Sequence, residues 1–109
     1  MLEADIQKQI LEYLEWKVRG KFWRINTGAH VAEYKGKSRF VRYGSPGMAD
    51  IIGVYYDEIQ GVGIFCAIEV KKAPNKPTKA QVAFLKEVND FGGKAIVAYS
   101  LEDVIEMFK

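Results

Sequence analysis

One stretch of the chain, from residue 62 to residue 99, constrains the fold more than any other. Within a predicted strand over 62–72, Ile64–Ile68 is continuously apolar, which is typical of a central strand covered on both faces. Residues 78–91 have the pattern of a helix, and residues 94–99 that of a further strand. A strand, a helix and a strand in this order form a βαβ unit, in which the strands lie parallel with a right-handed crossover.

The rest of the chain places this unit in a mixed sheet. The other expected elements are a helix over 3–17 ended by Gly20, strands over 21–26 and 51–56, a loop over 27–30, a hairpin pairing 31–34 with 39–43, and a short last helix from Ser100. The polar turn 57–61 makes the strands on either side of it antiparallel. We therefore expect one α/β domain over residues 1–109, with a mixed β-sheet flanked by helices.

Composition excludes several classes of protein. The 109 residues are 49% hydrophobic and 13% aromatic, enough apolar surface for a folded core. A lone cysteine, Cys66, and a lone histidine, His30, argue against a disulfide scaffold and a zinc finger. No apolar run approaches the ~20 residues of a membrane span, and the acidic, polar N-terminus does not read as a secretory signal. We expect a reducing, cytoplasmic setting without a membrane partner.

Charge is unevenly distributed along the chain. Two basic segments, 17–42 and 71–79, flank the acidic segment 43–70. A polyanion could lie against the basic segments while the acidic one binds a metal. The alternative interpretation is that basic loops only keep the protein soluble.

Two carboxylates are predicted to face one another. If the hairpin around 57–61 is regular, paired residues have numbers summing to about 119, which sets Asp50 opposite Glu69. Carboxylates about 4.5–5.5 Å apart at Cβ repel unless a cation lies between them. Oxygen ligands suit Mg²⁺ or Mn²⁺.

A lysine accompanies the pair. Lys71 shares a strand face with Glu69, and the backbone carbonyl of Val70 between them is a further candidate metal ligand. Such a lysine can orient or help deprotonate an attacking water, or stabilise developing negative charge. The alternative is a cross-strand accident with a local Glu69–Lys71 ion pair.

These residues resemble a known family. Gly44-Ser45-Pro46-Gly47-Met48-Ala49-Asp50, then Ile68-Glu69-Val70-Lys71, then Gln81, are similar to the motifs of the stand-alone VRR-NUC domain, of the PD-(D/E)XK nuclease superfamily. The resemblance runs from about residue 3 to residue 100. Ala49 stands where proline is common in the family, a position that is not a metal ligand.

The resemblance implies a restriction-endonuclease-like core in αβββαβ order and Mg²⁺-dependent hydrolysis of DNA phosphodiesters. It implies a homodimer that selects branched DNA, like a Holliday junction resolvase or a flap nuclease, in a bacterial cell or a phage-infected host. It also implies that Gln81 and Glu3 complete the catalytic set of Asp50, Glu69 and Lys71. Without the resemblance, Gln81 is a helix cap and Glu3 an acidic residue favoured in a first helical turn.

A larger set of residues is predicted to contact DNA phosphates. It comprises Asn26, Lys35, Lys37, Arg39, Arg42, Ser45, Lys72, Lys76 and Lys79. Turn, cap and solvated-surface roles are the alternatives for these side chains. Phe22, Phe40 and Cys66 are expected in the core, and His30 is expected to be solvated or to contact phosphate.

Two rival functions remain from the sequence. The first is a DNA-binding module of the same fold without catalysis, in which Asp50 and Glu69 are dispensable. The second is a metal enzyme acting on a small phosphorylated molecule. The absence of a G-x-x-x-x-G-K-[ST] phosphate loop counts against nucleotide hydrolysis.

Overall fold

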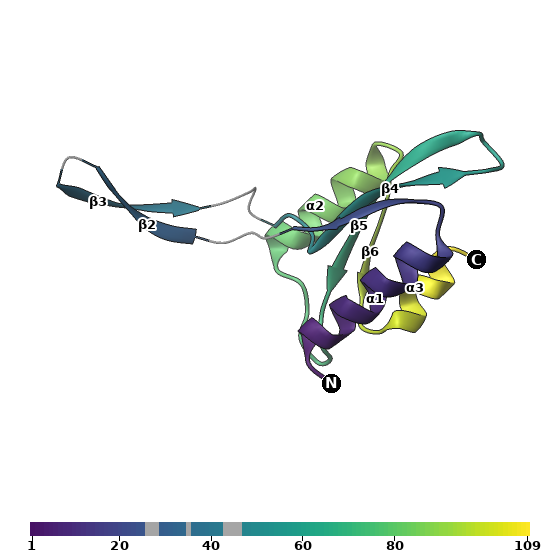
Figure 1. Cartoon of the computed structure of the whole chain (residues 1–109), viewed down its shortest axis with the longest axis horizontal. Coiled ribbons are helices and arrows are strands. Elements are labelled where there is room, and N and C mark those ends of the chain that lie inside the picture. Colours follow the sequence, from purple (N-terminus) through teal and green to yellow (C-terminus); the bar gives the residue numbers. More distant parts are fainter. Residues whose placement is uncertain (26–28, 35, 43–46) are drawn as a thin grey trace.

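The computed structural model describes residues 1–25, 29–34, 36–42 and 47–109 (Figure 1). The elements, in chain order, are α1 (Glu3–Lys17), β1 (Gly20–Arg24), β2 (Ala29–Tyr34), β3 (Lys37–Arg42), β4 (Ile51–Asp57), β5 (Val62–Val70), α2 (Lys79–Asp90), β6 (Lys94–Ala98) and α3 (Leu101–Met107). None of the helices in these ranges is long and apolar enough to cross a membrane.

The central element is a mixed four-stranded sheet. Its strand order is β1-β4-β5-β6, and β2 and β3 form a separate two-stranded sheet. Strand β4 is antiparallel to both β1 and β5, whereas β5 and β6 are parallel. The predicted βαβ unit is therefore confirmed as β5-α2-β6, and the predicted mixed sheet flanked by helices is confirmed with it.

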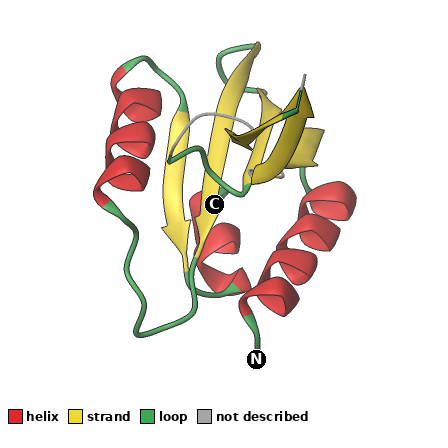
Figure 2. Ribbon diagram, turned by 90° about the vertical axis from the view of Figure 1, so that its left-hand side faces the viewer, coloured by secondary structure: helices red, strands yellow, loops and turns green. Residues whose placement is uncertain are grey.

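Helices cover the sheet from both sides. Helices α1 and α3 lie on one side and α2 on the other, as Figure 2 shows. The α1/α3 side contains the larger core, in which Ile10, Leu14, Ile68, Val70 and Val104 are fully buried. The α2 side has a smaller buried cluster of Ala49, Ala67, Leu85 and Ala95. Alternation along β5 explains the division, because Cys66, Ile68 and Val70 point to one face and Ala67 and Glu69 to the other.

Most element boundaries agree with the sequence. Helix α1 spans the predicted residues, the hairpin forms, and the buried Cys66 and the packed Phe22 are in the core as expected. Phe40 lies in β3, of which only the backbone is described. Strand β5 ends at Val70, two residues earlier than predicted, and His30 belongs to β2 rather than to a loop.

The predicted role of Gly20 was wrong. Helix α1 ends at Lys17, the N–H of the following cap residue Val18 donates to the carbonyl of Leu14, and Gly20 is the first residue of β1. A Cβ on Gly20 would lie 2.2 Å from the carbonyl oxygen of Val54. The glycine therefore serves the close approach of β1 to β4, not the end of the helix.

Candidate functional site

The candidate site lies where β4 begins and β5 ends. Ile51 pairs with Ile68, so that paired residue numbers sum to 119 as the sequence predicted. Asp50 precedes this last pair and Glu69 follows it, which sets the two carboxylates beside one another beyond the end of the ladder. By the alternation of β5, Glu69 is on the α2 side of the sheet.

Asp50 is held by a backbone hydrogen bond. Its Oδ2 accepts from the N–H of Val70 at 2.8 Å, across the gap between the two strands. The β4–β5 pairing ends at Ile51 and Ile68, so the Asp50 carboxylate, rather than a backbone carbonyl of β4, accepts the hydrogen bond from the Val70 N–H. This contact ties the orientation of Asp50 to the strand that carries Glu69.

Glu69 is the only charged residue buried in the described part of the chain. It is 2% exposed, and its Oε1 has no hydrogen-bond partner there. An unpartnered buried carboxylate oxygen is costly, and a cation is one of the few groups that could compensate it. The donor set of Asp50, Glu69 and the Val70 carbonyl consists of oxygen atoms only, which fits Mg²⁺ or Mn²⁺.

The protonation of Glu69 reflects this environment. Its pKa is raised from 4.5 to about 8, mainly by burial and in addition by a side-chain hydrogen bond with Asp50 and by the charge of Asp50. The charge of Lys71 lowers the pKa and that of Glu3 raises it. These effects show that Asp50, Lys71 and Glu3, all predicted site residues, are electrostatically linked to Glu69.

Lys71 follows directly after β5. Its N–H donates to the carbonyl of Ala98 at 3.0 Å, which continues the pairing with β6 by one residue, and its side chain is half-buried. Glu3, also half-buried, is the first residue of α1. The backbone of Lys71 is thus fixed by its pairing with β6. Glu3 belongs instead to the helical layer, at the start of α1.

Gly47 positions the segment before Asp50. From the sequence it was expected only to be part of a turn. Gly47 has a φ of +81°, and a Cβ there would lie 2.3 Å from the carbonyl oxygen of Ala80 in α2. The segment entering β4 therefore packs directly against the first turn of α2. The positive φ was foreseeable from a Pro-Gly turn, but the contact with a helix more than thirty residues later was not.

Gln81 is engaged in a helix cap. Its Oε1 accepts from the N–H of Thr78 at 2.8 Å, and the Oγ1 of Thr78 accepts from the N–H of Gln81 at 3.2 Å. The capping box that the sequence offered as the alternative is thus confirmed. A role of the Gln81 amide nitrogen at the site stays a prediction.

The predicted DNA contacts fall into three groups. Lys72 and Lys76 are exposed on the loop between β5 and α2, and the exposed Lys79 begins α2. Lys37, Arg39 and Arg42 lie in β3, of which only the backbone is described. Asn26, Lys35 and Ser45 lie outside the described residues. Of these residues, Lys72 directly follows Lys71 in the loop after β5.

The site has two carboxylates rather than a larger cluster. Across residues 1–25, 29–34, 36–42 and 47–109, no three His, Cys, Asp or Glu side chains form a group that could bind a metal ion. Any metal bound between Asp50 and Glu69 would complete its ligand shell with backbone carbonyl, water or substrate oxygens, which is usual for Mg²⁺. Neither a family model nor a curated protein matches this chain.

Proposed function

We propose that the chain is a Mg²⁺- or Mn²⁺-dependent endonuclease that hydrolyses DNA phosphodiesters. One observation supports this above the others: the buried Glu69 has an unpartnered oxygen directly beside Asp50, which a backbone N–H orients. A purely structural role does not account well for two adjacent carboxylates, because one of them must remain protonated in the absence of a cation. A divalent cation removes the conflict.

The proposed fold family agrees with the element order. Without the hairpin and α3, the chain runs α1-β1-β4-β5-α2-β6, which is compatible with the αβββαβ order of a restriction-endonuclease-like core. The VRR-NUC resemblance rests on the same residues that form the site. We extend it to a homodimer acting on branched DNA, because one site per chain requires two copies to cut two strands.

Each residue has a distinct role in the proposed chemistry. Asp50, Glu69 and the Val70 carbonyl would bind the metal, which supplies positive charge at a phosphoryl oxygen and lowers the pKa of water. The ammonium of Lys71 orients the attacking water or stabilises charge that develops on the phosphate. Glu3 and the Gln81 amide complete the polar surroundings.

Phosphate binding is assigned to the lysines that follow the site. Lys72, Lys76 and Lys79 are exposed and carry no described ion pair. Backbone contacts of this kind are sequence-independent and weaken with salt. The basic residues predicted in the hairpin are also expected to bind phosphate: Lys35, Lys37, Arg39 and Arg42.

The test is cleavage of labelled duplex, flap and four-way-junction DNA with Mg²⁺, Mn²⁺ or EDTA. We expect metal-dependent cutting that falls by about 10³-fold or more in Asp50→Ala, since a principal charge-stabilising contact is lost. Asp50→Asn, which keeps an acceptor for the Val70 N–H, separates loss of chemistry from loss of folding. Glu15→Ala, at an exposed carboxylate of α1, is the matched control.

Two outcomes would overturn the proposal. Cleavage that persists in Asp50→Asn and Glu69→Gln would show that the carboxylates are not the site. Tight DNA binding without cutting in either metal would instead identify a non-catalytic DNA-binding module.

A further inference from the structure

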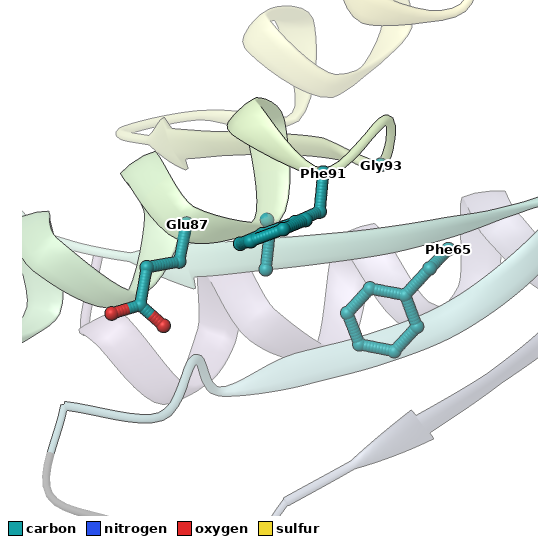
Figure 3. Close-up of a pocket in the computed structure, with 5 residues that line it drawn as sticks. Phe65, Glu87, Phe91 and Gly93 are labelled. Atoms are coloured by element: carbon teal, nitrogen blue, oxygen red, sulfur yellow. The ribbon is translucent and has the colours of Figure 1, made fainter.

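Two grooves of similar size lie on opposite sides of the sheet and differ in charge. The groove between β5 and the end of α2 has a volume of about 290 Å³ and is lined by Phe65, Glu87, Val88, Phe91 and Gly93. Figure 3 shows Phe65 on its strand and Glu87 and Phe91 on the other side of this space. The one charged residue among these five is a glutamate, so this groove does not attract a polyanion.

The second groove lies between α1 and β1. Its volume is about 320 Å³, and the residues that line it are Ala4, Gln7, Lys8, Leu11, Glu12, Glu15 and Arg24. Arg24 is the last residue of β1, whereas the others all belong to α1. Two exposed cations, Lys8 and Arg24, thus come from different elements and line the same groove.

One end of this second groove adjoins the candidate site. Gln7 follows Glu3 by one helical turn on the same face of α1, and both side chains are half-buried. On the strand, the N–H of Ile25, the residue after Arg24, donates to the backbone carbonyl of Asp50 at 2.7 Å. The groove therefore begins beside two residues of the site, Glu3 and Asp50.

The two cations of the groove are available to a ligand. Within the part of the chain that the structure describes, neither Lys8 nor Arg24 forms an ion pair, although Glu12 and Glu15 line the same groove. Lys8 precedes Glu12 by four residues, an order in which a helical ion pair is weaker than in the reverse order. The two carboxylates lie one and two turns further along α1, so positive charge predominates at the end beside the site.

A glutamine amide beside two cations can bind a phosphate group. A guanidinium donates two parallel hydrogen bonds to phosphate oxygens, an ammonium supplies a compact positive charge, and an amide adds an uncharged donor. At least half of the hydrogen bonds between proteins and DNA go to the phosphates and sugars, and these contacts fix the position of the DNA. The charged end of the groove therefore has the chemistry needed to hold a DNA backbone beside the carboxylate pair.

We propose that Gln7, Lys8 and Arg24 bind a DNA phosphate next to the one that is cleaved. The inference rests on the proposed function, because it takes DNA as the substrate. In the sheet, β1 lies on one side of the strand pair β4–β5, and the N–H of Lys71 bonds to Ala98 of β6 on the other side. The substrate is then held on both sides of the cleaved bond, which favours cleavage within a strand over removal of terminal nucleotides.

The test is the binding of labelled duplex and four-way-junction DNA in EDTA, where no cleavage is expected, over a range of salt concentrations. Lys8→Ala and Arg24→Ala should each weaken binding by about tenfold and reduce the slope of log K against log salt by about 1. Gln7→Glu should weaken binding to a similar extent, because it replaces an amide donor by a carboxylate. Lys109→Ala, which removes an exposed lysine outside the groove, is the matched control and should leave affinity and slope unchanged.

Cleavage measurements separate this inference from the nuclease assignment. With Mg²⁺, Lys8→Ala and Arg24→Ala should raise KM by about tenfold and leave kcat nearly unchanged, because the proposed metal ligands stay in place. If the wild type cuts DNA and both variants keep its affinity, salt slope and KM, the groove assignment is wrong and the nuclease assignment stands. Binding with the expected losses but without cutting in either metal would support the groove and overturn the nuclease. A wild type that does not bind DNA would overturn both.

Discussion

The two sides of the sheet differ in what they bury. On the α1/α3 side, large aliphatic residues such as Ile10, Leu14 and Ile68 are fully enclosed. On the α2 side, β5 and β6 present the small residues Ala67 and Ala95 to the helix, and one end of β5 carries the buried Glu69. At the other end of the same strand, Phe65 is partly exposed.

This difference separates the main hydrophobic core from the proposed metal site within one small sheet. The α1/α3 side is filled by hydrocarbon and has no buried charge among the described residues. The α2 side contains the unpartnered carboxylate oxygen of Glu69 and the partly exposed ring of Phe65. An unpartnered buried carboxylate is unfavourable, and the proposed cation would remove this cost. Substitutions on the two sides should therefore have different consequences.

The largest effect on stability is expected on the α1/α3 side. Leu14→Ala should lower the free energy of unfolding by about 2–5 kcal/mol, because it opens a cavity in a fully enclosed core. Phe65→Ala, on the α2 side, should cost clearly less, since the ring is 40% exposed. Urea unfolding of both variants measures this contrast, and equal losses would contradict it.

The next effect concerns the charge of Glu69. Because its pKa is about 8 in the folded protein and 4.5 for an unperturbed carboxyl, the folded state retains a proton that the unfolded state has lost between these values. Stability without metal should therefore fall as pH rises, by on the order of 3 kcal/mol between pH ~5 and pH ~8.

Glu69→Gln is the control for this pH dependence. The amide does not titrate, so the variant should lose most of the slope and be more stable than the wild type at pH ~8. Thermal unfolding of both proteins across this range measures it. A wild-type stability that is flat or rises over the same interval would show that Glu69 is ionised without a cation.

The smallest effect separates the two roles of Gln81. Thr78→Ala should cost about 1 kcal/mol of stability by removing the side-chain acceptor of the capping box, with little change in cleavage. Gln81→Ala removes the other half of the box and should cost a similar amount. If Gln81→Ala also lowers the cleavage rate while Thr78→Ala does not, Gln81 has a site role beyond the cap.

Much of this arrangement could be predicted from local sequence. The alternation and turn length around residues 57–61 gave the register that brings Asp50 and Glu69 together, because strand pairing in a hairpin follows from the turn. The parallel pairing of β5 and β6 followed from the strand-helix-strand order.

Other features depend on contacts that no local pattern contains. Gly20 was assigned to the end of a helix, yet its place is set by the Val54 carbonyl of another strand. The contact of Gly47 with Ala80 and the uncovered state of Trp23 and Phe65 depend on where α2 lies over the sheet. The burial of Glu69 without a partner also became visible only in three dimensions.

The most direct test of the central claim is the effect of a divalent cation on thermal stability at pH ~8. About 10 mM Mg²⁺ or Mn²⁺ should raise the Tm of the wild type by binding the ionised Asp50–Glu69 pair of the folded state. Glu69→Gln should start from a higher Tm without metal and show little further increase. An equal increase in both proteins, or none in the wild type, would contradict the assignment of this carboxylate pair as a metal site.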